Sequence, residues 1–311
     1  MLGVKINRFS SSFPVGKVII KYLFPMDFEE YLIAINETKL LEEIRAHYQK
    51  NEPLLTAIHE KALDLYKKYL VLGGMPVMIE EFIKKDYQVS KVDFEIQDYI
   101  IATYLADMNK YTENTEGIKN SKIYNAIPKE LARENNIFKY SIVSKDARKI
   151  RYESSLDWLL SSNIILKCSL TERNESPLKA FMSGDKFKIY LSDSGLLRAL
   201  SNIDYQEILL EKTKRYKGVL TENYVAYELY TKTRELYYYT FDKYEIDFLL
   251  KIEGEIIPVE VKSSRRTNSK SLNAYIEKYH PKYAIRISKK NFGFENNVKS
   301  VPLYAVFCIT K

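Results

Sequence analysis

The chain has 311 residues, 46% of them hydrophobic, which is enough apolar material for the cores of two or three domains. Its 48 basic and 41 acidic residues leave a formal net charge of +7, which mildly favours an anionic partner. No stretch approaches the roughly 18 apolar residues of a membrane-spanning helix, and the cysteines and histidines lack zinc-site spacing. These features argue against membrane and zinc-finger proteins. With no signal-peptide pattern at the N-terminus, they predict a cytoplasmic setting.

The first 27 residues predict no domain of their own, and the region that follows predicts helices. Apolar residues recur at helical spacing to about residue 110. Asp27 is a suitable N-cap for the first of these helices. The glycines of residues 73–76 break the pattern, and a new helix is expected to begin after Pro76. We therefore predict separate segments over 1–27 and 28–115.

Residues 116–204 predict a winged helix. Its predicted elements are helices near residues 122–133, 144–152 and 153–160, a strand over 164–169, and a strand over 187–191 that pairs back with it. The polar link between the strands would be the wing. Basic residues gather before the third helix: Lys145, Arg148, Lys149 and Arg151. DNA-binding helices of this type use such residues on phosphates. A solvated helix face in a protein-binding module is the alternative.

Residues 205–311 predict an α/β domain. The expected elements are a helix over 217–235, strands over 236–241, 244–250 and 256–262, a helix over 269–279, and strands over 283–287 and 301–309. Gly254 lies in the short link of a hairpin between the second and third strands. Because side chains alternate along a strand, we expect Ile246, Phe248 and Leu250 to share one face. Glu245 and Asp247 should lie on the other.

The central hairpin carries three charged residues that are expected to meet. Glu260 and Lys262 are two positions apart and so project together, and pairing of the strands would bring Asp247 close to them. Two carboxylates and a lysine could hold a divalent cation and activate a water against a phosphodiester. A surface ion pair worth under about 1 kcal/mol is the alternative. Acids within apolar runs are costly when unpaired, which favours a functional role.

This arrangement resembles the PD-(D/E)xK nuclease-like fold, with Asp247 and the Glu260-x-Lys262 pair in the motif positions. The resemblance implies Mg²⁺ as the cofactor, held by Asp247, Glu260 and the backbone carbonyl of Val261. Lys262 would orient or deprotonate the attacking water. The family often adds an acid from the preceding helix, and Glu222 occupies that place.

The sequence departs from the nuclease-like pattern at two positions and carries additional basic residues after the motif. Ile246 replaces the usual proline before the first acid, and Asn273 is the nearest counterpart of the glutamine that active members often carry in the next helix. Basic residues without an intervening acid follow the motif, namely Arg265, Arg266 and Lys270, and are expected to hold a phosphate backbone.

The whole chain also resembles bacterial and archaeal AAA-type ATPases that carry an uncharacterised C-terminal domain. The matching segments, in order, are residues 13–17, 23–32, 72–76, 187–197, 221–223, 245–248 and 259–263. A phosphate-binding loop of the form G-x-x-x-x-G-K-[ST] and a Walker B run are both missing from the sequence. Residues 1–27 would then be a remnant of the ATPase core. ATP belongs to the full-length family and is not expected to bind here, where the ATPase module would be the partner in cis.

The sequence therefore predicts an α+β multi-domain fragment: a helical region, a winged helix and a C-terminal PD-(D/E)xK nuclease-like α/β domain. The predicted function is nucleic-acid binding with Mg²⁺-dependent phosphodiester hydrolysis. The alternative is an inactive module that recognises DNA or a partner protein and is driven by the missing ATPase. No membrane partner is expected, and an oligomer is left open.

Overall fold

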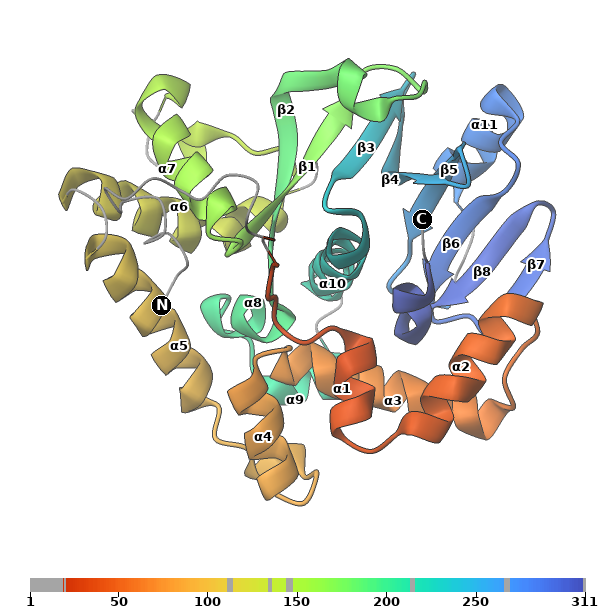
Figure 1. Ribbon diagram of the computed structural model, residues 1–311, viewed down its shortest axis with the longest axis horizontal. Coiled ribbons are helices and arrows are strands. Elements are labelled where there is room, and N and C mark those ends of the chain that lie inside the picture. Colours follow the sequence, from red (N-terminus) through yellow and green to blue (C-terminus); the bar gives the residue numbers. More distant parts are fainter. Residues whose placement is uncertain are drawn as a thin grey trace.

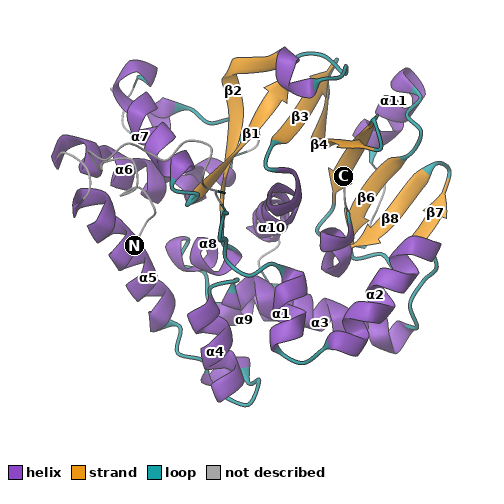
Figure 2. Ribbon diagram, in the orientation of Figure 1, coloured by secondary structure: helices purple, strands orange, loops and turns teal. Residues whose placement is uncertain are grey.

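The computed structural model describes residues 19, 21–110, 114–133, 136–143, 148–212, 216–265 and 269–309. Within these ranges, helices surround a mixed sheet of eight strands in the order β2-β1-β3-β4-β5-β6-β8-β7 (Figures 1 and 2). The strands are β1 (Ile165–Thr171), β2 (Met182–Leu191), β3 (Leu236–Phe241), β4 (Tyr244–Ile252), β5 (Glu255–Val261), β6 (Ala284–Ser288), β7 (Gly293–Glu295) and β8 (Val298–Pro302). The predicted α+β class is confirmed.

The predicted helical region is confirmed and lies along the lower and left edges of the molecule (Figure 1). Its elements are α1 (Phe28–Ala34), α2 (Thr38–Lys50), α3 (Thr56–Leu72), α4 (Pro76–Lys84), the 3₁₀ turn η2 (Val89–Lys91) and α5 (Glu95–Lys110). Asp27 caps α1 as expected, because its side chain accepts from the Glu30 amide at 2.9 Å while Glu30 accepts from the Asp27 amide. Pro76 opens α4, also as expected.

The next segment contains α6 (Asn114–Leu131), the 3₁₀ turn η3 (Tyr140–Ile142) and α7 (Lys149–Ser161). The prediction of two helices that meet between Tyr152 and Glu153 is wrong, because both residues lie inside α7. Nothing in that sequence breaks a helix, and Tyr152, Leu156 and Leu159 form one buried stripe at helical spacing. The predicted pairing of the following strands is confirmed, since β1 and β2 are antiparallel with Ser169 opposite Phe187.

The C-terminal segment follows the predicted order α10, β3, β4, β5, α11, β6. Its helices are α9 (Tyr205–Leu209), α10 (Tyr216–Thr233) and α11 (Lys270–Tyr279), with the 3₁₀ turn η5 (Leu303–Cys308). The 3₁₀ turn η4 (Leu178–Phe181) and α8 (Ser194–Leu200) precede this segment. The strand predicted over 301–309 is wrong, because β8 ends at Pro302 and η5 follows. Proline cannot continue a hydrogen-bonded ladder, and η5 is buried along most of its length against several helices.

The two long C-terminal helices cover opposite faces of the sheet. α10 packs on β1, β2, β3 and β5, whereas α11 packs on β4 and β5. The hydrophobic residues of β4 divide between two cores: Phe248 and Leu250 join the core that includes α10, and Ile246 and Leu249 join the core that includes α11. The expectation that Ile246, Phe248 and Leu250 share a face is therefore wrong.

A β-bulge explains this division. β3 and β4 pair through Tyr237 with Leu249 and through Tyr239 with Ile246, so one extra residue is inserted into β4 between these pairs. The insertion reverses the alternation after Ile246 and falls where Asp247 lies. Bulges of this kind re-aim side chains and are over-represented next to active sites.

Two of the sequence segments that carried the family resemblance meet in a buried contact between helices. The carboxylate of Asp193 accepts from the backbone amides of Leu196 and Gly74, each at 2.7 Å, so it caps α8 and also binds the turn after α3. Gly73 has φ +75°, and a Cβ there would lie 2.3 Å from the Asp193 carboxylate. The glycine turn and Asp193 are therefore explained by packing of the scaffold.

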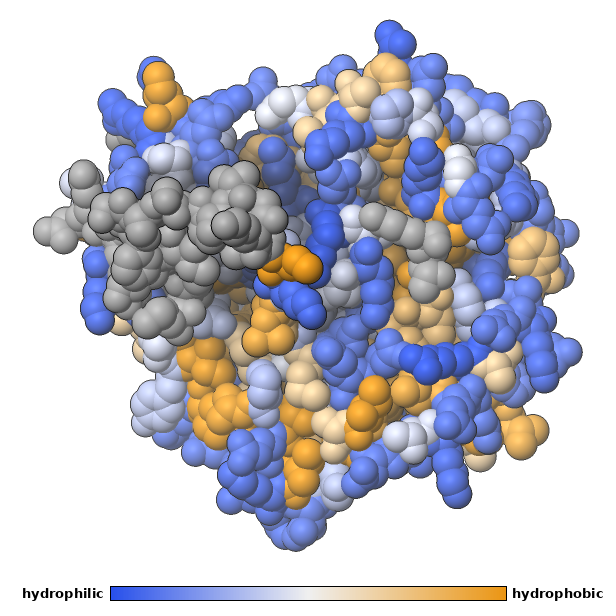
Figure 3. Space-filling model, viewed as in Figure 1, coloured by the Kyte–Doolittle hydropathy of each residue, from blue (hydrophilic) through white to orange (hydrophobic). Residues whose placement is uncertain are grey.

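The sheet continues across the predicted boundary at residues 204 and 205. β1 pairs in parallel with β3, and Asn223 on α10 bonds both the amide and the carbonyl of Leu191 at the end of β2. The face seen in Figure 3 is mainly hydrophilic, with hydrophobic residues exposed over α4 and α5 at the lower left. Val77 and Tyr99 are among the exposed apolar side chains on these helices. No described helix is long and apolar enough to cross a membrane.

Candidate active site

The three motif residues of the central hairpin come together. Asp247 lies at the bulge of β4, and its Oδ2 accepts a hydrogen bond of 2.7 Å from the backbone amide of Val261 on β5. Glu260 and Lys262 flank Val261, as strand alternation predicted. β4 and β5 are antiparallel, with Phe248 opposite Val259, so the hairpin register alone brings the two carboxylates to the same end of the strand pair.

Glu260 is the most buried of these acids and has one unsatisfied oxygen. Its Oε1 forms an ion pair of 2.5 Å with the Lys262 Nζ. Its Oε2 is buried and has no hydrogen-bond partner among the described residues. Across the parallel pair β5–β6, Glu260 lies opposite Arg286. A buried carboxylate oxygen without a donor is costly, so this atom is suited to a ligand that supplies positive charge.

Glu222 lies in a neighbouring group of residues. Its Oε1 accepts from the Tyr190 hydroxyl at 2.6 Å and from the Lys188 Nζ at 3.3 Å. Lys188 also bonds Glu245 at 2.7 Å, and its side chain is only 2% exposed, so it depends on these two acids. The Lys188 ammonium lies 5.1 Å from the centre of the Tyr238 ring. Glu222 therefore contacts Lys188 and Tyr190, with no hydrogen bond to the hairpin motif itself.

Electrostatics link the two groups through Asp247. Burial raises the pKa of the Asp247 carboxyl well above its usual value, and the negative charges of Glu260 and Glu222 raise it further. The positive charge of Lys188 and the Val261 amide oppose this shift only in part. Asp247 is thus harder to ionise than an ordinary aspartate, and a cation that offsets the neighbouring carboxylates would favour its ionised form.

Both lysines of the site remain charged. Burial acts to lower the pKa of Lys262, but the charge of Glu260 and its hydrogen bond outweigh this and hold the pKa above the usual value. Burial likewise opposes the charge of Lys188, while Glu222 and Glu245 raise its pKa. For Glu222, burial raises the pKa, but Lys188 and the Tyr190 hydroxyl outweigh it and leave the pKa below its usual value. Lys262 is therefore a donor to a water or a phosphate, and is unsuited to act as a base in this state.

Among the described residues, the oxygen ligands of Asp247 and Glu260 match the preference of a hard divalent cation. Mg²⁺ prefers oxygen ligands and one or two carboxylates, which Asp247 and Glu260 supply. The unsatisfied Glu260 Oε2 and the raised pKa of Asp247 are both features that a cation would relieve. No group of three or more His, Cys, Asp and Glu residues within the described ranges is close enough to form a metal cluster. The match to a divalent cation therefore depends on Asp247 and Glu260 alone among the described acids.

Sequence reasoning missed Lys188 and Tyr190. They belong to a strand in which Phe187, Ile189 and Leu191 are buried on one face. Lys188 lies on the opposite face, which is buried as well. A lysine that alternates with core residues in a strand is a signal for a buried acidic partner. The sequence could not name Glu222 and Glu245 as those partners, because they follow Lys188 by 34 and 57 positions.

The predicted phosphate-binding residues lie on exposed segments. Arg148 and Arg151 are exposed at the start of α7, and Lys149 there pairs with Asp185 of β2 at 2.7 Å. Arg265 is exposed after β5 and is paired to Glu60 of α3, and Lys270 is exposed at the start of α11. Two further predicted residues, Lys145 and Arg266, lie outside the described residues.

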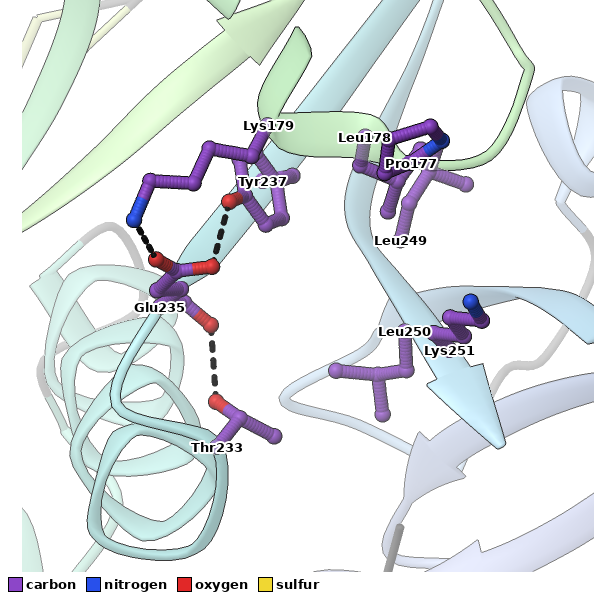
Figure 4. Close-up of a pocket in the computed structure, with 9 residues that line it drawn as sticks. All are labelled: Pro177, Leu178, Lys179, Thr233, Glu235, Tyr237, Leu249, Leu250 and Lys251. Carbon is purple, nitrogen blue, oxygen red and sulfur yellow. Dashed lines mark hydrogen bonds and ion pairs between the residues drawn. The ribbon is translucent and has the colours of Figure 1, made fainter. Parts of the chain in front are cut away.

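A separate pocket of about 240 Å³ lies elsewhere on the sheet (Figure 4). It is lined mainly by apolar side chains, including Leu178, Leu249 and Leu250. Glu235 at its edge accepts from Lys179 at 2.6 Å and from the Tyr237 hydroxyl at 2.7 Å. None of the predicted site residues lines this pocket, so we do not assign the chemistry to it.

Models of two protein families match separate segments of the chain. Residues 63–207 match the model of a domain of unknown function (DUF8612), and residues 217–306 match that of a second domain of unknown function (DUF4143). The second is found in AAA-ATPase-associated proteins, which agrees in outline with the predicted ATPase association. It spans α10 to η5 and contains Glu222, Asp247, Glu260 and Lys262. No curated protein and no solved structure matches the chain.

Proposed function

We propose that this chain binds nucleic acid and hydrolyses its phosphodiester bonds with a divalent cation, and that its C-terminal segment is PD-(D/E)xK nuclease-like. The observation that supports this most directly is the approach of the two acids at the β4–β5 hairpin: Asp247 accepts from the Val261 amide next to Glu260, and Glu260 Oε2 is buried and unsatisfied. The order α10, β3, β4, β5, α11, β6 also agrees with the order expected for that fold. The basic start of α7 would contribute further phosphate contacts, as in a winged helix.

In this proposal each residue has a distinct task. Asp247 and Glu260 would hold the cation with the Val261 carbonyl, and the cation would polarise the phosphoryl group and lower the pKa of a water. Lys262, which stays protonated, would orient the attacking water and offset negative charge on the phosphate. Lys188 would fix Glu222 beside the site, where the charges of Lys188 and Glu222 have opposite effects on the pKa of Asp247.

A cleavage assay tests the proposal. Plasmid, linear duplex, single-stranded DNA and RNA would be incubated with Mg²⁺ or Mn²⁺ and the wild-type chain, Asp247→Asn or Lys262→Ala. We expect metal-dependent cleavage that each variant lowers by about 100-fold or more, as for removal of a charge-stabilising donor. The matched controls are Glu253→Gln and Lys282→Ala, which alter an exposed glutamate–lysine pair of 3.5 Å outside the site. Cleavage that persists in both Asp247→Asn and Lys262→Ala would contradict the assignment of the active site.

One contact favours a second candidate, a recognition module without catalysis. The Lys262 ammonium lies against Glu260 at 2.5 Å and so partly satisfies the acid that would bind the cation. A protein in which this pair is permanent would bind nucleic acid or a partner protein and cut nothing. Salt-dependent DNA binding with no cleavage under any metal would support this candidate over the first.

A further inference from the structure

A basic pocket lies beside the candidate active site. It has a volume of about 280 Å³ and is formed by α3, the segment before α10, the start of α10 and the loops that follow β5 and β6. Its charged lining residues are Lys67, Lys217, Arg265, Lys289, Glu60 and Glu211. Four cations face two carboxylates, which leaves an excess of two positive charges.

Arg265 is paired with Glu60, but the remaining carboxylate does not fully satisfy the three lysines. Glu211 is shared between Lys217, at 2.7 Å, and Lys289. Among the described residues, the ion-pair partner of Lys67 is Asp64 on its own helix, at a long distance of 3.8 Å. Burial lowers the pKa of Lys289 to about 8, and the neighbouring Lys217 contributes to this shift. A further anion in the pocket would therefore stabilise charges that the protein itself leaves poorly compensated.

The pocket shares its supporting elements with the acidic site. Lys217 lies five residues before Glu222 on α10, a rise of about 7.5 Å. Arg265 follows Lys262 by three residues, which span at most about 10 Å. Lys289 follows β6, whose Ile287 carbonyl accepts from the Lys262 amide at 2.8 Å. The basic pocket and the acidic site are therefore carried by the same elements, only a few residues apart along the chain.

We propose that Lys67, Lys217, Arg265 and Lys289 form a phosphate-binding subsite for a nucleic-acid strand, which holds a backbone phosphate near the bond presented to Asp247 and Glu260. This assignment rests on the proposed function and adds a subsite to it. A strand fits better than a small anion, because one ligand must place a phosphate among these cations and another at the adjacent acidic site. Glu211 would be displaced from the lysines as the phosphate binds.

The test measures binding without metal, so that it is independent of cleavage. Fluorescence anisotropy of a labelled 20-nucleotide single strand in EDTA would be followed from 50 to 300 mM salt at pH 6.5, where Lys289 is protonated. We expect Lys67→Gln/Lys217→Gln to weaken binding about tenfold, and to reduce the slope of log K against log salt by about 0.7 for each phosphate that the variant no longer neutralises. The charge-matched control is Lys84→Gln/Lys278→Gln on exposed sites, which should leave the slope unchanged.

Two further variants separate a ligand contact from a structural role. Glu211→Gln removes the competing carboxylate and should tighten binding several-fold, whereas Lys217→Arg keeps the charge and should bind like the wild type. Thermal melting would confirm that each variant is folded.

Three results of the anisotropy measurement would overturn the subsite: no oligonucleotide binding by the wild type, equal binding by the pocket variant and its control, or weaker binding by Glu211→Gln. Full competition by equimolar inorganic phosphate would identify a small-anion site and also overturn it. Hydrolysis of bis(4-nitrophenyl) phosphate, measured separately, reports on the acidic site alone and so distinguishes failure of the two proposals.

Discussion

Asp247 is the residue at which stability and function are expected to conflict. Its pKa is raised by burial and by Glu260 and Glu222, so its ionised form destabilises the fold. Asn can keep an oxygen to accept from the Val261 amide while it removes the charge. We expect Asp247→Asn to raise the thermal midpoint at neutral pH by about 2 °C or more, the shift that roughly 1 kcal/mol produces in a chain of this size.

The stability difference between Asp247→Asn and the wild type is expected to grow as the pH rises. Because the folded pKa lies above the unfolded value, the wild type is relatively stable below about pH 4, where Asp247 is protonated in both states. That advantage is lost as the pH rises through the folded pKa. Melting curves from pH 4 to 8 should therefore show the wild type and Asp247→Asn converging at acid pH and separating at neutral pH. A variant less stable than the wild type at pH 7 would contradict this reading.

The charged residues of the site show which contacts a local sequence pattern can predict and which it cannot. Strand alternation correctly placed Glu260 beside Lys262, and hairpin pairing correctly brought Asp247 to them. The bulge was not predictable, because it depends on the register between β3 and β4. Lys188 was missed for a similar reason, since its partners come from α10 and β4.

At the scale of elements, Asp193 joins two helices through one carboxylate. Asp193→Ala removes the cap of α8 and leaves the Gly74 amide without its acceptor, so we expect a loss of about 2–4 kcal/mol. Asp204→Ala is the matched control, because Asp204 caps α9 in an exposed position through the Gln206 amide and joins no second helix among the described residues. It should cost about 1 kcal/mol. Equal losses in urea unfolding would show that the contact with Gly74 adds nothing.

Most helices and the core hairpin were predictable because their signals are local. Asp27, Pro76 and Gly254 mark the starts and turns that were expected, and each is found in that role. The error over residues 301–309 has a tertiary cause. That run is apolar enough for a strand, but β8 already ends at Pro302, and the Leu303 carbonyl accepts instead from the Tyr224 hydroxyl at 3.0 Å.

At the scale of the whole molecule, the sheet couples the two matched family segments. β3 has β1 as a parallel neighbour, and α10 is bound to β2 through Asn223. Residues 205–311 alone would expose an unpaired edge of β3 and part of the α10 surface. We expect this piece to show no cooperative melting, whereas the full chain melts cooperatively. A folded monomer of residues 205–311, seen by dispersed amide resonances, would contradict the coupling and restore the predicted domain boundary.

The central claim is that Asp247 and Glu260 bind a divalent cation, and calorimetric titration with Mg²⁺ or Mn²⁺ tests it most directly. The wild type and Asp247→Asn would be titrated at pH 6.5 in two buffers of different ionisation enthalpy, with and without a bound oligonucleotide. We predict saturable binding with proton release from Asp247, absent from the variant. No binding by the wild type in either state, or equal binding by the variant, would contradict the account.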